Sequence, residues 1–476
     1  MPAKRSLNPL DRLFLAAETH ESLIHVGVLI PFSPPPDGGR DLNLRQLLDD
    51  LKRQPKVFAP WSYKLKHPEL LTSPLQAWVE DPDLDVDYHV RRSALPTPGD
   101  ERELGILVSR LHSNRIDFHR PPWEFHFIEG LEGGRIAIYF KVHHALVDGY
   151  TGMRLLMRSL STDPSERDTP VFFMQPPPAA SARHEDEEHA PTLGRLFHEL
   201  QEQVDATRDA GRALMNVLSA ARAKDRSLVA PLQAPRSVLN QKISRNRRFA
   251  TQQYDAGRLR RIAKAHDGTL NDVVLALCGS ALRRLLAEQD ALPDKSLTAM
   301  LPVNIRPKDD PGGGNAVGAI LATLATDIAD PVKRLEAIIT STRRAKGQLQ
   351  GLSKSAILQY STMLLSPGLL SQIPGAVGRV RPAFNVVVSN VPGPETPLYF
   401  RGWRAEALYP LSIPFHGFGL NITVNGYNGT LSFGFIGCRD ALPHLQRLAV
   451  YSGEALEELE ATLGPVAAAE AAAQSV

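Results

Sequence analysis

The chain has 476 residues, of which 43% are apolar and 22% charged, an ordinary globular composition that is long enough for two domains. The formal net charge of +2 argues against nucleic acid as a partner, and two cysteines, Cys278 and Cys438, argue against a disulfide framework or a cysteine-rich metal site. Neither a secretory leader nor an apolar run of about 18 residues is seen, so we expect a cytoplasmic protein that meets a membrane only peripherally.

The first 162 residues alternate between helical and extended patterns and form the first predicted subdomain. Asn8-Pro9 is a typical helix start, because asparagine caps helices and proline fits their first turn. The spacing of apolar residues predicts strands over 25–31, 76–90, 123–130 and 135–142, and helices over 42–53, 101–114 and 153–160. Gly133-Gly134 predicts a hairpin between the last two strands.

The most informative stretch is His143-His144-Ala145-Leu146-Val147-Asp148-Gly149, which lies where a predicted buried strand gives way to a helix. An imidazole held there by rigid elements can face a cavity and accept a proton near neutral pH. Other interpretations stay open, because the pair also suits polar surface or a core contact, and Asp148 suits a helix N-cap. Histidine and aspartate also bind zinc, but no further His/Cys cluster at ligand spacing accompanies them, so we expect no metal.

A change of composition follows the first subdomain. Residues 163–192 contain three consecutive prolines and an acidic run, which predict a mobile linker and the domain boundary. Residues 193–235 have helical spacing and a basic face, which suits either a solvated connecting helix or contact with anionic lipid or phosphates. Residues 236–465 form the second predicted subdomain, and the Ala/Glu-rich residues 466–476 form a frayed tail.

The second subdomain also mixes strands and helices. The predicted strands are 242–249, 299–305, 384–391, 418–424 and 430–436, and the predicted helices are 269–285, 331–350, 354–375 and 440–463. The stretch Thr269-Leu270-Asn271-Asp272 is predicted to cap the first of these helices, and Asn271 and Asp272 are both suited to that role. The helix at 354–375 is unusually apolar, which favours a core helix and leaves lipid or membrane contact as the alternative.

Several stretches together resemble one protein family. The H-H-x-x-x-D-G pattern of 143–149 is shared by chloramphenicol acetyltransferase, condensation domains and carnitine acyltransferases. The bacterial wax ester synthase/diacylglycerol acyltransferases also resemble this chain at 121–123, 271–276, 302–306, 389–394 and 419–424. The matches run from about residue 8 to 455. Pro122 departs from the family pattern, where leucine is usual, which we expect to affect local turn geometry.

The resemblance implies an α/β fold made of two chloramphenicol acetyltransferase-like subdomains, each a mixed sheet with flanking helices, and an active-site channel between them. It implies acyl-CoA as a co-substrate with no other cofactor, and a fatty alcohol or diacylglycerol as acceptor. The products would be wax esters, triacylglycerols or both. A peripheral place on the inner membrane face or on lipid inclusions fits these substrates. Oligomeric state and chain-length preference are not implied.

The resemblance also implies roles for single residues. By motif position, His144 is the general base, while His143 and Asp148 shape and hold the loop, with Arg306 as candidate ionic partner of Asp148. We assign Asn271 to the developing oxyanion or its positioning, and Asp272 to an orienting role. The remaining assignments are to substrate binding: Gly149, Trp123, Asn304 and Asn390.

The chemistry needs few groups. A hydroxyl is a poor nucleophile until a base removes its proton, whereas a thioester carbonyl is already electrophilic. No cysteine or serine has nucleophile-elbow spacing, so we expect direct transfer without a covalent acyl-enzyme. Two alternatives remain: a condensation-type transferase with an amine or carrier-bound acceptor, which the absence of a carrier domain disfavours, and a non-catalytic lipid-binding or lipid-droplet protein that uses 354–375.

Overall fold

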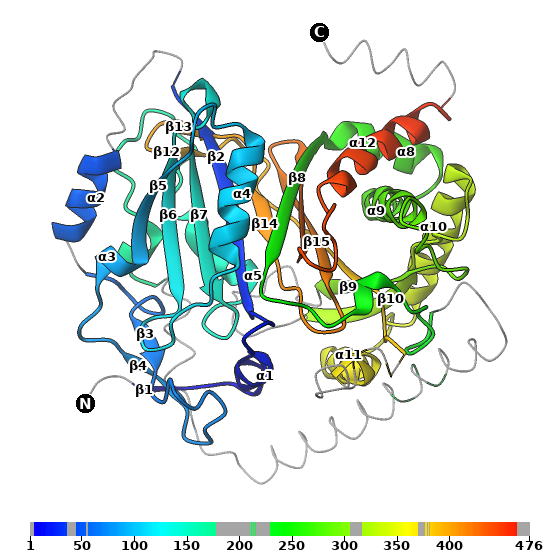
Figure 1. Cartoon of the computed structure of the whole chain (residues 1–476), viewed down its shortest axis with the longest axis horizontal. Coiled ribbons are helices and arrows are strands. Elements are labelled where there is room, and N and C mark those ends of the chain that lie inside the picture. The colour runs from blue at the N-terminus through cyan, green and yellow to red at the C-terminus, as the bar shows by residue number, and fades with distance from the viewer. Residues whose placement is uncertain are drawn as a thin grey trace.

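The computed structural model describes residues 4–35, 44–53, 56–177, 211, 213, 215, 229–304, 317–369, 377, 379 and 381–463. Two halves lie side by side, each built on its own β-sheet with helices (Figure 1). This arrangement confirms the predicted α/β fold with two subdomains.

The first half contains a large sheet, a small three-stranded sheet and five α-helices among its described residues. Its elements are β1 (Lys4–Ser6), α1 (Pro9–Ala17), β2 (His25–Ser33), α2 (Leu44–Arg53), β3 (Tyr63–Leu65), β4 (Ala77–Glu80), α3 (Val86–His89), β5 (Val90–Ala94), α4 (Glu101–His112), β6 (Trp123–Glu129), β7 (Ile136–His143) and α5 (Gly149–Met157). Every residue of β7 is buried, because β2 pairs with it on one side and β6 on the other.

One predicted strand segment is a short helix instead. Residues 86–90 have an extended pattern, yet Val86–His89 forms α3. The reason is Asp85, whose carboxylate accepts hydrogen bonds from the backbone N–H groups of Asp87 and Tyr88 and so caps a helix. The strand β5 begins only after this helix, at Val90.

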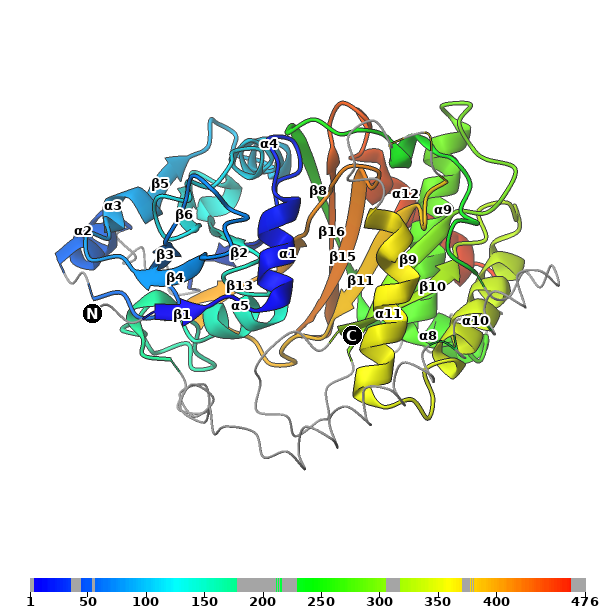
Figure 2. The same ribbon diagram turned by 90° about the horizontal axis from the view of Figure 1, so that it is seen from below.

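The second half has a six-stranded sheet in the order β10-β9-β11-β15-β16-β8. Its elements are β8 (Arg247–Asp255), α8 (Ala256–Ala265), α9 (Leu270–Ala287), β9 (Thr298–Asn304), β10 (Val317–Thr323), α10 (Pro331–Gly347), α11 (Lys354–Leu369), β11 (Val386–Val391), β15 (Leu420–Tyr427), β16 (Thr430–Cys438) and α12 (Arg447–Glu460). Helices α8, α9, α10 and α12 cover the side of this sheet that faces away from the first half (Figures 1 and 2).

The predicted extent of the second subdomain needs a correction. Residues 236–465 do not all belong to it, because β12 (Tyr399–Phe400), β13 (Trp403–Ala405) and β14 (Tyr409–Leu411) join the sheet of the first half. Both β13 and β14 pair antiparallel with β2. The crossing segment therefore covers the edge of β2, which would otherwise expose unpaired backbone groups.

The predicted mobile linker is also wrong over its first part. Residues 163–177 pack on the first half, and Phe172 and Phe173 are fully buried among its aromatic side chains. The backbone N–H of Phe58 donates to the carbonyl of Phe173 at 2.9 Å, which fixes the segment. The rest of the predicted linker, most of the predicted connecting helix and the predicted tail lie outside the described residues.

The two halves share a layer of apolar side chains. Leu29 of β2, Tyr139 of β7 and Leu107 of α4 pack with Phe249 of β8 and Ile436 of β16. The helix α4 lies between the two sheets, beside β8 (Figure 1). Side chains of β15 and β16 on this side of the second sheet therefore point toward the first half.

The apolar helix α11 packs partly on the second half. Its residues Tyr360 and Leu364 are buried in the core of that half, so this face behaves as a core helix. The last six residues of the predicted helix, 370–375, lie outside the described residues. Among the described residues, no helix is both long and apolar enough to span a bilayer.

Candidate active site

The histidine pair lies at the C-terminal end of β7, where the backbone is held from both neighbouring strands. His143 is the register partner of His25 in β2, and its backbone N–H donates to the carbonyl of Pro122 at 2.9 Å. The backbone N–H of His144 donates to the carbonyl of Ile24 at 3.0 Å. These bonds place the two imidazoles on a rigid frame, as a catalytic base requires.

The His144 ring is half-buried and packs against Phe14 of α1, with ring centroids 4.3 Å apart. Its Nδ1 is buried and has no partner of good hydrogen-bond geometry among the described residues. Burial lowers the pKa of His144 to about 4, while the charge of Asp148 and the carbonyl of His144 itself oppose this shift. The imidazole is therefore neutral at physiological pH, which is the form that accepts a proton.

His143 is fully buried, and its ring contacts neighbouring residues of the protein. Its Nε2 lies 3.6 Å from a carboxylate oxygen of Glu18, and Phe118 packs edge-on against its ring. The same Glu18 oxygen accepts the backbone N–H of Ile24 at 2.6 Å. Nδ1 of His143 accepts a hydrogen bond from the backbone N–H of Ala145 at 3.2 Å. This arrangement fits the predicted shaping role.

Sequence reasoning missed Phe14 and Glu18, both of which contact the histidine pair. Phe14 is one of several apolar residues of α1, so nothing in the periodicity separates it from its neighbours. Glu18 follows directly after α1, at a position where a solvated glutamate is ordinary. No local sequence pattern predicts that Glu18 is buried, with a side chain that is only 2% exposed.

Asp148 caps α5, in line with the structural alternative left open above. One carboxylate oxygen accepts the backbone N–H of Thr151 and the other accepts its hydroxyl, both at 2.9 Å. The negative charge stays near His144 and near Asp11, whose pKa is raised to about 6 by burial and, to a smaller degree, by Asp148. Arg306, the predicted ionic partner, lies outside the described residues, so that pairing stays a prediction.

Two of the residues assigned to substrate binding lie in the first half. Trp123 is fully buried, donates its indole N–H to the carbonyl of Trp61 at 2.8 Å, and stacks on His89 and Phe173. It is a core residue, and its assignment to substrate binding is wrong. Gly149 begins α5 and is exposed, and a Cβ there would meet no described atom within 4 Å.

The candidate residues at the start of α9 have distinct positions. Thr269 is the N-cap, and Asp272 completes the capping box, so neither Asn271 nor Asp272 is the cap itself. Asp272 is buried and also accepts the Thr342 hydroxyl at 2.6 Å, which orients the helix start. Asn271, the residue before Asp272, is half-buried. Its role at the oxyanion stays a prediction.

The register of β11 and β15 decides which polar residues face the first half. Asn390 pairs with Val424, a residue of the helix-covered core, so Asn390 lies on that face of the sheet, and its assignment to substrate binding stays a prediction. Ser389 pairs with Thr423 on the opposite face, where the Thr423 hydroxyl donates to Asn421 at 2.9 Å. Asn304 ends β9, and its side chain is not described.

Chemically, the described site offers one accessible neutral imidazole, a nearby carboxylate and an apolar wall. Within the described ranges no three His, Cys, Asp or Glu side chains gather at metal-binding distance. The two cysteines are buried, and burial raises the pKa of Cys278 to about 12, so Cys278 does not resemble an activated thiolate. This arrangement suits proton abstraction from a hydroxyl.

The low pKa of His144 leads to a pH prediction. An ordinary histidine loses its base form below pH about 6.5, but His144 keeps it until the pH approaches its pKa of about 4. We expect kcat/KM to show no titration of this group between pH 8 and 6, and an acid limb only well below pH 6. Steady-state rates over this range test it, and an acid limb centred at about 6.5 would argue against a buried base.

The stability of the folded protein sets the lowest pH at which these rates can be measured. Burial also lowers the pKa of His25 and His112 well below 6.5. A group whose folded pKa lies below its unfolded pKa contributes its full stability above the unfolded value and loses it as the pH falls toward the folded value. Unfolding should therefore become easier as the pH falls below about 6.5, and circular dichroism at each pH identifies the rates that come from folded protein.

The chain matches two family models. The model of the wax ester synthase/diacylglycerol acyltransferase catalytic domain matches residues 7–274, and the model of the C-terminal domain of the same family matches residues 313–460. Together they cover the histidine motif and most of the second half.

Individual relatives agree with these matches. A Mycobacterium tuberculosis protein, whose name assigns it diacylglycerol O-acyltransferase activity provisionally, is 52% identical over 97% of this chain and 98% of its own length. The Acinetobacter baylyi protein named O-acyltransferase WSD is 39% identical, over 96% of this chain and 98% of its own. The solved structure of a wax ester synthase/diacylglycerol acyltransferase from Marinobacter aquaeolei is 38% identical, covers 96% of this chain and 98% of its own, and has a TM-score of 0.76.

Proposed function

Because the chain belongs to the wax ester synthase/diacylglycerol acyltransferase family, we propose that it transfers a long-chain acyl group from acyl-CoA to a hydroxyl group. The acceptor is a fatty alcohol, which gives a wax ester, or diacylglycerol, which gives a triacylglycerol. The observation that carries the mechanistic part is the half-buried, neutral imidazole of His144 at the end of β7.

The reaction is a single displacement. His144 takes the proton of the acceptor hydroxyl as its oxygen attacks the thioester carbon, the new C–O bond forms, and the C–S bond breaks. The departing CoA thiolate then receives the proton from the imidazolium. Nδ1 of His144 is buried, so Nε2 is the nitrogen that faces the hydroxyl. Asp148, whose charge raises the pKa of His144, stabilises the imidazolium while it exists.

The developing oxyanion needs a donor, and an amide side chain there is worth on the order of 10²–10³-fold in kcat. We assign this role to Asn271, in the first turn of α9 and in the half opposite His144. A helix N-terminus adds a favourable field for negative charge. No covalent acyl-enzyme is required, because the burial of Cys278 and Cys438 leaves both thiols without access to substrate.

The balance between the two acceptors is tested by competition. Purified protein is given one acyl-CoA together with hexadecanol and diacylglycerol, and the two ester products are separated and counted. Product from either acceptor supports the proposed function, and the ratio gives the preference. Absence of ester from both acceptors, with any long-chain acyl-CoA, would overturn it.

We further propose that the face carrying α1 docks on a lipid surface, because the substrates are insoluble in water. Leu13 of α1 is 46% exposed, and its neighbour Phe14 contacts His144. Leu70 and Leu75 are 57% and 70% exposed on a segment that Arg12 of α1 holds through the carbonyls of Ser73 and Gln76. Figure 2 shows α1 and α11 on the same face of the molecule.

Vesicle binding tests this docking. We expect the variant Leu70→Ser/Leu75→Ser to lose co-sedimentation with anionic phospholipid vesicles, because exposed leucines supply the apolar contact. Val450 of α12 is 56% exposed and lies far from α1 (Figure 1), so Val450→Ser is the matched control and should bind normally. Equal sedimentation of all three proteins would reject the proposed face.

A further inference from the structure

We propose that Arg247 of β8 is a positioning residue for His144, which it holds in place through the turn at residues 18–24. This inference deepens the proposed function and rests on it for its kinetic readout. Arg247 belongs to the second half and the turn to the first, so the position of the base would depend on the contact between the two halves.

The turn is bonded directly to the catalytic loop. The carbonyl of Ile24 accepts the backbone N–H of His144 at 3.0 Å. The backbone N–H of Ile24 in turn donates to Glu18, whose same carboxylate oxygen lies 3.6 Å from Nε2 of His143. The other oxygen of Glu18 accepts Nε of Arg115 at 3.0 Å. A shift of the turn would therefore carry both histidines with it.

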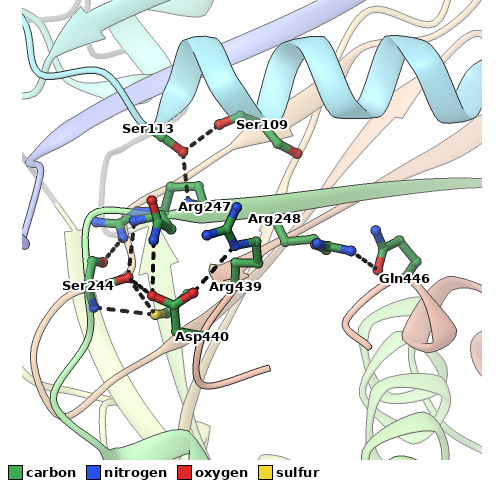
Figure 3. A network of polar contacts seen from close by, with 10 residues as sticks. Ser109, Ser113, Ser244, Arg247, Arg248, Arg439, Asp440 and Gln446 are labelled. Carbon is green, nitrogen blue, oxygen red and sulfur yellow. Dashed lines mark hydrogen bonds and ion pairs between the residues drawn. The ribbon is translucent and has the colours of Figure 1, made fainter. Parts of the chain in front are cut away.

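Arg247 reaches the turn from the other half. One terminal guanidinium nitrogen donates to the carbonyl of Glu21 at 2.7 Å, and the other donates to the carbonyl of Ser244 at 2.5 Å. Its backbone N–H donates at 2.8 Å to the hydroxyl of Ser113, the C-cap residue of α4. Figure 3 shows Arg247 between α4 and the loop at Ser244. The guanidinium of Arg247 is thus hydrogen-bonded to one backbone carbonyl in each half.

A second bond from the second half reaches the same turn. The backbone N–H of His416 donates to the Ser22 hydroxyl at 3.2 Å. The turn itself is closed by Thr19, whose backbone N–H donates to the carbonyl of Ser22 and whose hydroxyl accepts the backbone N–H of Ser22. Two neighbouring residues, Glu21 and Ser22, are therefore held by the second half.

The burial of Arg247 needs a reason other than stability. The residue is 3% exposed, and burial lowers the pKa of its guanidinium to about 10, while the charge of Glu18 opposes the shift. Taking a charge out of water is expensive, and well-packed apolar residues often replace buried charges without loss. A buried arginine that donates to two backbone carbonyls in different segments is suited to fixing their relative position.

The test compares Arg247→Met with a matched control, Arg248→Met. Arg248 is the next residue of β8 and donates to Gln446 of its own half at 3.4 Å, so it has no described bond to the turn (Figure 3). We expect Arg247→Met to lower kcat on the order of 10–10²-fold, because a small displacement of a reacting group has effects of that size. The KM values for acyl-CoA and acceptor should change little, and Arg248→Met should behave as wild type.

Hydrogen–deuterium exchange supplies a readout that does not depend on activity. In Arg247→Met the amides of residues 18–24 and of His144 should exchange faster than in wild type, while those of β15 should not. Wild-type kcat, or unchanged exchange at these amides, in folded Arg247→Met would overturn the proposal. A raised KM with unchanged kcat would also overturn it, because Arg247 would then act on substrate binding.

A conservative variant protects the test against misfolding. Arg247→Lys keeps the charge, but it has one nitrogen where arginine has two separate terminal nitrogens, so it should hold the two carbonyls less well than arginine does. We expect Arg247→Lys to have a kcat between those of wild type and Arg247→Met, at an unchanged melting temperature. If Arg247→Met does not fold, the kcat of Arg247→Lys tests the positioning role instead. If wild-type protein itself gave no turnover, the proposed function would fail, while the exchange experiment would still decide whether Arg247 positions the turn.

Discussion

Replacing His144 with alanine is expected to lower kcat by about 10²–10⁴-fold, because the acceptor hydroxyl then has no positioned base. The KM for acyl-CoA should change little, since the thioester is bound by other groups. The fold should persist, because the His144 side chain is half-buried and its backbone bond to Ile24 does not involve the imidazole. Initial rates of CoA release with saturating acceptor measure the change.

The matched control for this variant is His119→Ala. His119 is an exposed histidine that contacts Glu69 and Asp117, and no contact among the described residues connects it to the proposed chemistry. Its loss should leave kcat unchanged. Near-normal turnover by His144→Ala would reject the assignment of the base, whereas a comparable loss in both variants would point to a general effect on the protein.

The second large effect is expected in the buried ion pair between Lys141 of β7 and Glu124 of β6. Lys141 is 0% exposed, lies 3.0 Å from the Glu124 carboxylate, and donates to the carbonyls of Leu111 and Asn114 at the end of α4. Burial alone would raise the pKa of Glu124, but a hydrogen bond from His126 and the charge of Lys141 hold it at about 2. Both groups are therefore charged inside the protein.

Glu124→Gln should reduce the free energy of unfolding by about 3–5 kcal/mol, because removal of one partner leaves the other charge buried and unpaired. Lys141→Met should have an effect of similar size, measured by urea denaturation. The double variant Glu124→Leu/Lys141→Met should lose clearly less than the sum of the two single changes. Additive losses would show that the two side chains are not coupled.

The histidine motif and its frame could be predicted from the sequence because their signals are local. The alternating apolar residues of β7, the capping asparagine of α1 and the helical spacing of α5 each depend on a few neighbours in the chain. The same holds for the start of α9, where Thr269 and Asp272 of the predicted capping stretch form a capping box. Two-layer α/β architecture follows once such elements alternate in both halves.

What could not be predicted depends on residues far apart in the sequence. The strands β12, β13 and β14 are two or three residues long, too short for a periodic signal, and they exist because β2 offers them an edge. Arg247 meets Glu21 only after the two halves come together. The burial of Trp123, by contrast, agrees with its sequence position, because an aromatic residue on a strand is more often in the core than at a substrate.

The segment at 163–177 shows why composition alone misled. Prolines and acidic residues predict a linker, yet Phe172 and Phe173 lie within it. The free energy gained by burying their two aromatic rings exceeds the entropy lost when the flexible neighbouring residues become ordered. The face of the sheet on which Asn390 lies could not be predicted either, because it depends on the register of β11 against β15, which no single-strand pattern contains.

A single-turnover experiment tests most directly that the acyl group passes straight from CoA to the acceptor, with His144 as the base and without a covalent intermediate. Protein in excess is mixed with radiolabelled long-chain acyl-CoA, first without and then with a fatty alcohol or diacylglycerol, and denatured protein and lipid products are counted separately. We predict labelled ester only when acceptor is present, no label on the protein under either condition, and almost no ester from His144→Ala. Label that stays on the denatured protein, or ester formed by His144→Ala at the wild-type rate, would contradict this mechanism.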